Sequence, residues 1–152
     1  MDRYSSYIIQ ITNSSTSSTV ITGVLIFVIG QVILKWFLEP LISLKEQLGK
    51  TSALFLREQA IITNCSNKND IVNQLKECAS SLLAKKSAVT WHGLFSFIRL
   101  IPSAKNIQNA AQSMNLIAGL IQQNDKEGDA ATNIYVEMEK IAKFIKIVVR
   151  YG

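Results

Sequence analysis

The sequence predicts an all-α protein, with one N-terminal transmembrane helix followed by a small cytoplasmic domain of about four to five helices. Three observations support this prediction: a mainly apolar run from Val20 to Leu38, helical spacing of apolar residues in the later segments, and no β pattern of comparable length. We expect a short extracytoplasmic tail over 1–18, the transmembrane helix over 19–38 and one helical domain over 40–152.

The apolar run VITGVLIFVIGQVILKWFL has the length of a membrane span. Its 19 residues correspond to about 28 Å of helix, close to the ~30 Å hydrocarbon core of a bilayer. A signal peptide or a buried core helix is the alternative. However, the preceding tail is rich in Ser and Thr rather than basic, and no A-x-A cleavage pattern follows. Lys35 and Trp36 suit the inner membrane interface, so we predict a span.

The distribution of basic residues predicts the orientation of this span, because Lys and Arg close to a span favour the cytoplasmic side. Arg3 is the only such residue on the N-terminal side, whereas the C-terminal side offers Lys35, Lys45, Lys50 and Arg57. We therefore expect the N-terminus outside and the C-terminus in the cytoplasm. The N-terminal tail is expected to be disordered.

Charge is concentrated in the C-terminal domain. Only two of the 16 Lys and Arg residues and two of the 11 Asp and Glu residues precede residue 40, so the whole formal excess of +5 lies beyond that point. A basic excess that faces the cytoplasm suits anionic lipid headgroups or a phosphate-bearing ligand.

The sequence does not favour an enzyme. Cys65 and Cys78 form no C-x-x-C motif, the chain has one histidine, and it lacks the common motifs of hydrolases, metalloproteases and nucleotide hydrolases. We expect no catalytic residue, metal site, disulfide or cofactor. The acidic residues of a nuclease would have to be Asp125, Glu127 and Asp129, which have the composition of a solvated loop and helix cap. A protein of this kind acts by binding.

The first part of the domain predicts two helices. Pro40 suits the first turn of a helix, so the span and the next helix are either separate or one helix kinked at this proline. Apolar residues at helical spacing extend the first domain helix over 41–63, and the polar run SNKN ends it. Asn69 or Asp70 then caps a second amphipathic helix that ends near Ser87.

The second part predicts a short turn and two further helices. The aromatic segment 91–101, WHGLFSFIRLI, is expected to be a buried helical turn before Pro102. Ser103 caps the next helix, a polar loop follows at 124–128, and Asp129 caps the last helix. The apolar residues of that last helix have spacings of 4 and 3, which suit either a coiled-coil contact between subunits or packing within one domain: Ile134, Met138, Ile141, Ile145 and Val148.

A candidate ligand site lies in the basic and aromatic middle of the domain. Between Ile71 and Gln122 five cations accompany a single acid, Glu77. Cations neutralise phosphates, aromatic or imidazole rings stack on bases, and amide side chains read base edges. The candidate ligand-binding residues are Lys85, Lys86, Trp91, His92, Arg99, Lys105 and Asn106.

A purely structural interpretation of the same segment remains open. Lys85 and Lys86 are also typical of a solvated helix C-terminus. Leu94, Phe95 and Phe97 then belong to the hydrophobic core, and His92 packs beside Trp91 rather than titrating for function.

Three residues of the span form a candidate helix–helix interface. Gly23 and Gly30 are seven residues apart and offer small side chains for close packing, and the amide of Gln31 prefers a partner on another helix. We predict self-association through this face, although a single Gln in a span is also tolerated without a partner.

Two segments resemble a known group of proteins. FVIGQVILKWFLEPLISLKEQLGKTSALFLREQAIITN, residues 27–64, and LFSFIRLIPSAKNIQNAAQSMNLIAGLI, residues 94–121, resemble small bacterial inner-membrane proteins with one span and a helical cytoplasmic domain. In length and topology the chain is similar to a membrane effector of type III CRISPR systems within this group. No ligand-binding motif is matched residue by residue.

The resemblance implies a function in antiviral defence. It implies a ligand-sensing domain over 40–152 that binds a cyclic oligoadenylate second messenger, in particular cyclic tetra-adenylate, and not duplex nucleic acid. The spans of a homo-oligomer, such as a tetramer, would then perturb the lipid bilayer of the bacterial inner membrane. The alternatives are a membrane-anchored helical adaptor, or a toxin-like or holin-like membrane protein, with no nucleotide ligand.

Overall fold

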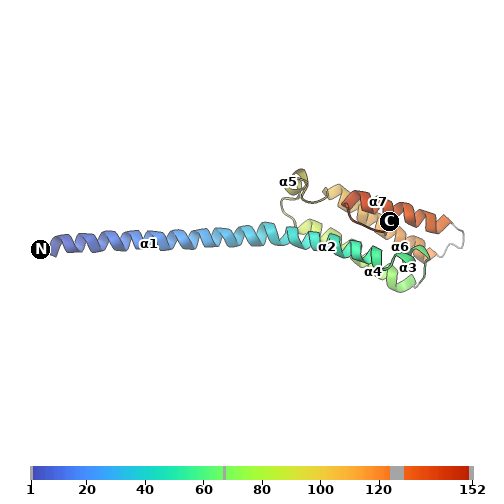
Figure 1. Ribbon diagram of the computed structural model, residues 1–152, viewed down its shortest axis with the longest axis horizontal. Helices are drawn as coiled ribbons and strands as arrows, with labels where there is room; N and C mark the ends of the chain where they lie inside the picture. Colours follow the sequence, from blue (N-terminus) through green and yellow to red (C-terminus); the bar gives the residue numbers. More distant parts are fainter. Residues whose placement is uncertain (1, 67, 124–128, 151–152) are drawn as a thin grey trace. The chain divides into compact units, whose positions relative to one another are not determined.

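The computed structural model describes residues 2–66, 68–123 and 129–150, and this part of the chain contains helices and no strand (Figure 1). The all-α class predicted from the sequence is confirmed. The elements in chain order are α1 (Asp2–Ile33), the π-helix η1 (Leu34–Leu38), α2 (Glu39–Arg57), α3 (Gln59–Thr63), α4 (Lys68–Ala88), α5 (His92–Phe97), α6 (Ala104–Gln123) and α7 (Asp129–Ile145).

The chain divides into two compact units after Glu39. The N-terminal unit is a helix whose side chains from Thr16 to Leu34 are exposed. Within the described residues, this helix is the one long and apolar enough to cross a membrane. It begins at Asp2, so the prediction of a disordered tail is wrong. No Pro or Gly interrupts residues 2–22, and helical hydrogen bonds therefore propagate from the apolar segment to the N-terminus.

The helix widens into a π-helix directly before Pro40. The backbone N–H of Glu39 donates to the carbonyl of Leu34, a spacing of five residues instead of four. Proline has no N–H, and its ring crowds the carbonyl four residues earlier, which is that of Trp36. A wider turn relieves this clash, so the sequence feature that predicted a break produces a local π-helical segment before the start of α2.

The predicted helix 41–63 is divided into α2 and α3 by a bend at Glu58. The predictions for α4, α6 and the start of α7 agree with the structure within two residues. Ser103 caps α6 as expected, because its Oγ accepts a hydrogen bond from the backbone N–H of Asn106 at 3.2 Å. The predicted loop 124–128 lies outside the described residues.

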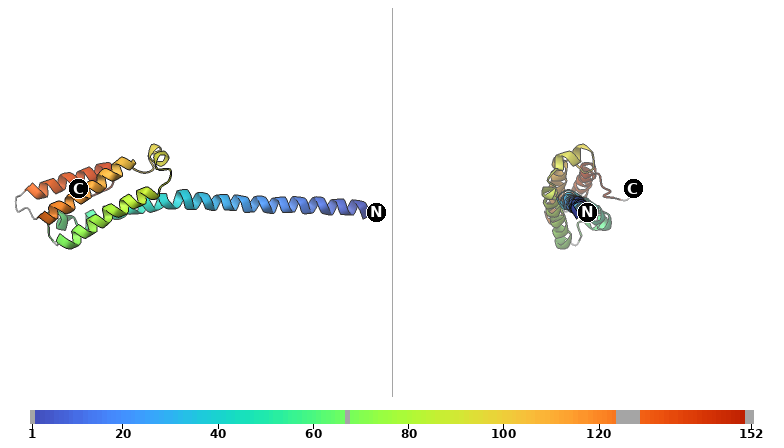
Figure 2. Two further views of the ribbon diagram at one scale, coloured as in Figure 1. Left: turned by 180° about the vertical axis from the view of Figure 1, so that it is seen from behind. Right: turned by 90° about the vertical axis from the view of Figure 1, so that its left-hand side faces the viewer.

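The C-terminal unit is a bundle in which α6 lies between α4 and α7 (Figures 1 and 2). Small side chains on α6, including Ala110, Ala111 and Ala118, are almost fully buried and let both neighbours approach closely. The larger buried residues of α6 are Ile107, Met114, Ile117 and Ile121. All the buried apolar residues of the core cluster lie between Leu41 and Val149, so the C-terminal unit contains its own core.

The last helix ends earlier than its apolar pattern suggested. Ile134, Met138, Ile141 and Ile145 are buried as predicted, but Val148 is exposed. The reason is the backbone at Lys146, whose φ of 54° is left-handed and ends the helix. Beyond this residue the helical period no longer applies, and Val149 is buried in place of Val148.

The aromatic segment is helical but not buried as a whole, which corrects the prediction. Phe95 is partly buried and packs against the core, whereas Leu94 and Phe97 are exposed. With only six residues, α5 has one inward-facing turn, and its other apolar side chains have no neighbouring helix to cover them.

Two neighbouring residues of α6 test the packing of the bundle. Ile117 is fully buried and Leu116 is 57% exposed. Replacing Ile117 with Ala should lower the free energy of unfolding by about 2–5 kcal/mol, because it leaves a cavity. The matched variant Leu116→Ala should stay within about 0.5 kcal/mol of the parent. Urea unfolding of residues 40–152, followed by circular dichroism, measures the free energy of unfolding of both variants. An equal loss in Ile117→Ala and Leu116→Ala would contradict the central position of α6.

Candidate functional site

The predicted ligand-binding residues occupy one continuous connection in the bundle. Lys85 and Lys86 lie in the last turn of α4, Trp91 and His92 at the start of α5, and Arg99 directly after it. Lys105 and Asn106 lie in the first turn of α6. All of them except the half-buried Lys86, His92 and Asn106 are exposed. The structure therefore presents these residues at one end of the α4–α6 pair.

His92 lies in a positive environment. Desolvation by burial lowers the pKa of its imidazole, and the nearby charge of Lys86 lowers it further, against a smaller opposite effect from a backbone hydrogen bond. Its Nε2 atom is buried without a hydrogen-bond partner in the described part of the structure. Both causes favour the neutral imidazole, which suits packing or stacking better than phosphate binding.

A basic pocket of about 230 Å³ brings one predicted residue together with two that the sequence analysis missed. Lys45 from α2, Arg99 after α5 and Lys146 after α7 line it. Its apolar floor comes from the neighbouring aliphatic residues Leu48, Leu100, Ile101, Ile145 and Ile147, together with Pro102. No acidic side chain is among these lining residues. The arrangement offers positive charge beside a small apolar surface.

In the described part of the chain, none of these three cations forms an ion pair. The ion pairs of the described residues are Arg57–Glu58, Lys140–Glu137 and Arg150–Glu139, and they involve neither Lys45, Arg99 nor Lys146. Unpaired cations around one concave surface raise the local positive potential and attract anions.

Backbone strain coincides with this pocket. Arg99 and Lys146 have φ values of 59° and 54°, in the left-handed region that normally favours Gly. At Arg99 the turn is a Schellman motif, because the N–H of Arg99 donates to Ser96 O and the N–H of Leu100 donates to Phe95 O. Two cationic residues at glycine-type positions on one pocket point to a use for their side chains, since strained residues cluster at functional sites.

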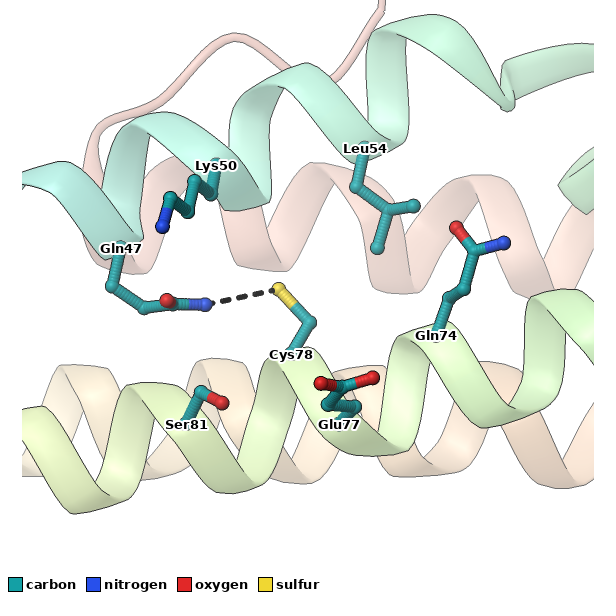
Figure 3. Close-up of a pocket in the computed structure, with 7 residues that line it drawn as sticks. All are labelled: Gln47, Lys50, Leu54, Gln74, Glu77, Cys78 and Ser81. Carbon is teal, nitrogen blue, oxygen red and sulfur yellow. Dashed lines mark hydrogen bonds between the residues drawn. The ribbon is translucent and has the colours of Figure 1, made fainter.

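A second, polar groove of about 320 Å³ lies between α2 and α4 (Figure 3). In it, Gln47 Nε2 donates to Cys78 Sγ at 3.6 Å, and Thr51 Oγ1 lies 3.1 Å from the same sulfur. Burial raises the pKa of the Cys78 thiol, against the opposite effect of these hydrogen bonds. A thiol that stays protonated is a poor nucleophile, so we interpret this groove as helix packing. Among the described residues no group of His, Cys, Asp and Glu could hold a metal ion.

The predicted transmembrane interface residues lie on α1. Gly23 and Gly30 are seven residues apart, which places them on one face of the helix, whereas Gln31 is rotated by about 100° from Gly30. A methyl group added at either glycine would meet no atom of this chain. The glycine face is thus open for a neighbouring helix.

Comparisons with protein-family models, with curated proteins and with solved structures found no match for this chain.

The basic pocket could not be recognised from sequence because its cations come from three distant segments. Lys45 and Lys146 are about one hundred residues apart, and only the antiparallel packing of the bundle brings their segments together. A signal did exist for Arg99, since it lies in a stretch from Cys78 to Asn124 that contains no acidic residue.

Glycine substitutions separate backbone strain from anion binding. Arg99→Gly should raise the free energy of unfolding by roughly 0.5–1 kcal/mol, because it relieves the left-handed strain. It should also weaken the thermal stabilisation that inorganic tripolyphosphate produces, because it removes a pocket cation. Cys65 has the same motif away from the pocket, with a φ of 50°. Cys65→Gly should therefore leave the tripolyphosphate effect unchanged, with a smaller gain in stability than Arg99→Gly because the partly buried Cys65 side chain packs against the core. A lower free energy of unfolding in Arg99→Gly would contradict the claim that the left-handed backbone at Arg99 is strained.

The lowered pKa of His92 predicts how stability depends on pH. The unfolded chain binds a proton near pH 6.5 more readily than the folded protein, so this contribution to stability is present above that pH and is lost as the pH falls. His92 is the single histidine of the chain. The urea midpoint should thus fall between about pH 7.5 and 5.5, and His92→Gln should reduce this fall. An identical fall in both proteins would show that His92 is not responsible.

Proposed function

We propose that this protein is a non-enzymatic membrane effector whose C-terminal unit binds an anionic ligand at the basic pocket. The observation that carries the proposal is the convergence of Lys45, Arg99 and Lys146, without an acidic neighbour, on one concave surface. The left-handed backbone at two of these three residues supports it. The apolar N-terminal helix supplies the candidate membrane span.

The resemblance noted in the sequence suggests a cyclic oligoadenylate, in particular cyclic tetra-adenylate, as the ligand. The pocket of about 230 Å³ is smaller than the ~300–1,000 Å³ of ordinary small-molecule sites. It suits one phosphodiester and its sugar rather than a ring of four nucleotides. A tetramer would match a four-fold ligand, with each protomer holding one phosphate. Because one pocket holds only one phosphate, binding of cyclic tetra-adenylate requires a symmetric assembly of several protomers.

The proposed output is a change in the spans of the oligomer. A switch of the closed-to-open ratio from 1:99 to 99:1 requires the ligand to favour the open state by about 5.5 kcal/mol. Contacts of cations with phosphate contribute about 1.5–3 kcal/mol each, so a few contacts repeated by symmetry are sufficient. In this proposal the face of Gly23 and Gly30 forms the contact between spans, and the orientation is N-terminus outside in the bacterial inner membrane.

Binding to the full chain in detergent micelles tests the proposal. We expect labelled cyclic tetra-adenylate to bind, with an affinity that decreases with salt. Lys45→Gln, Arg99→Gln and Lys146→Gln should each weaken binding about tenfold and lower the salt slope by about one.

The matched control is Lys76→Gln, which makes the same charge change on α4 outside this pocket. It should bind like the parent. Linear tetra-adenylate and inorganic tripolyphosphate in separate titrations show whether the ring and bases matter or the phosphates alone. Absence of binding by all three anions at low salt would refute an anion-binding function. Binding of tripolyphosphate alone would retain the pocket and reject the cyclic nucleotide.

A further inference from the structure

The short helix α5 exposes a stripe of large apolar side chains. Trp91 is 53% exposed, Leu94 52%, Phe97 85% and Ile98 53%. Their spacing of three, three and one residues puts them on one face of the helical turn. Single exposed apolar residues are common on proteins, but a contiguous stripe that includes Trp and Phe marks a contact surface. We call these four residues the α5 stripe.

The orientation of the α5 stripe is fixed by the core. Phe95, between the stripe residues, is partly buried and packs against the core cluster. The turn after α5 is closed by the hydrogen bonds from Arg99 N–H to Ser96 O at 3.0 Å and from Leu100 N–H to Phe95 O at 2.9 Å. Phe95 lies about 100° around the helix from Leu94, so its contact with the core, together with the Schellman turn, leaves Leu94 and Phe97 facing outward. The packing of Phe95 and the hydrogen bonds of this turn therefore keep the stripe exposed.

Lysines flank the α5 stripe on both sides along the chain, in a stretch of sequence without an acidic residue. Lys85 and Lys86 precede it in the last turn of α4, and Lys86 is close enough to influence the pKa of His92. Lys105 follows in the first turn of α6. These lysines form no ion pair with any described residue. No Asp or Glu occurs between Cys78 and Asn124. Apolar and aromatic groups flanked by lysines are the composition of a membrane-interface element.

The connection along the chain limits how far this region can lie from the candidate span. Residues 99–102, directly after α5, line the basic pocket together with Lys45 and Leu48 of α2. Lys45 follows Leu38, the last residue of the predicted span, by only seven positions. Even a fully extended chain of that length covers at most about 25 Å, and a helix covers about 10 Å. Whatever the arrangement of the two units, the segment after α5 therefore shares a pocket with a residue, Lys45, that the chain holds within about 25 Å of the end of the candidate span.

We propose that the α5 stripe docks on the anionic surface of the membrane in which the span is inserted. Trp91, Leu94, Phe97 and Ile98 enter the interfacial layer, and Lys85, Lys86 and Lys105 contact anionic headgroups. A second copy of the chain is a less suitable occupant, because it would bring a like-charged cluster to the same place. This proposal rests on the membrane insertion of the candidate span in the proposed function, but it does not depend on anion binding, because the docking surface is the outer face of α5 and not the cations of the basic pocket.

Depth-dependent quenching of one tryptophan tests the proposal in the full chain. The chain has two tryptophans, so Trp36→Phe leaves Trp91 as the single fluorophore. The protein is placed in nanodiscs of phosphatidylglycerol and phosphatidylcholine, with or without bromine on the acyl chains. We expect the bromine to cause a loss of Trp91 fluorescence and the emission to be shifted to the blue. Both effects should weaken in pure phosphatidylcholine and at high salt.

Two controls make the result specific. A protein with Trp36→Phe, Trp91→Phe and Leu116→Trp carries its fluorophore at another exposed apolar position, on α6, and should not be quenched by bromine. In the Trp36→Phe protein, Phe97→Ser should reduce quenching of Trp91, whereas Leu116→Ser should not. Phe97 is 85% exposed, so its replacement leaves the fold intact.

Three results would overturn the proposal. The first is quenching of Trp91 no greater than that of the tryptophan at position 116. The second is equal quenching in anionic and zwitterionic discs at every salt concentration, which would exclude the role of the lysines. The third is a blue shift without quenching by bromine, which would mean that a second copy or another part of the protein covers α5.

Discussion

The close packing of α6 between α4 and α7 is the constraint on which the rest of the C-terminal unit depends. The helices α4 and α6 have 21 and 20 residues, or about 30 Å each, so their ends coincide when they pack antiparallel. The connection through α5 and the end of α7 then reach the same end of the bundle. Small buried residues such as Ala111 and Ala118 make this approach possible. The pocket around Arg99 and Lys146 is a consequence of that packing.

The same packing concentrates positive charge where the chain has no acid to balance it. Lys85, Lys86, Arg99 and Lys105 all lie in the stretch without Asp or Glu, and Lys45 and Lys146 join them through the fold. Like charges gathered in this way repel one another and lower stability. Arg99 and Lys146 add the cost of a left-handed backbone. Features that oppose folding at one location are best explained by binding to an anionic partner there.

The fold could be predicted from sequence where periodicity and capping act locally. The apolar run, the cap at Ser103 and the apolar faces of α4, α6 and the first turns of α7 follow from residue spacing alone. The failures share a different cause. Val148 is exposed because a left-handed residue ended the helix, and Phe97 is exposed because no helix covers the outer side of α5. The exposure of both residues depends on which elements lie nearby in space. The spacing of apolar residues along the chain does not give this information.

The candidate site, too, has one part that could be predicted from sequence and one part that depends on the fold. Arg99 could be predicted, because the acid-free stretch around it is visible in the sequence, but its partners Lys45 and Lys146 could not. The three side chains share a surface only because the second turn of α2 meets the segments that follow α5 and α7. The span residues Gly23 and Gly30 stay a prediction, since a face that meets no atom of its own chain is defined by a partner helix.

The two proposed contacts are joined by one short segment, and this has a thermodynamic consequence. Phe95 and Ser96 of α5 accept the hydrogen bonds that hold Arg99 and Leu100 in the turn next to the basic pocket. A bilayer that holds α5 and an anion that holds Arg99 therefore restrict the same few backbone dihedrals. Whichever contact forms first has already ordered the segment for the other. Because coupling between two binding events is reciprocal, an anionic membrane that strengthens anion binding must itself be bound more tightly by the anion-loaded protein, by the same factor.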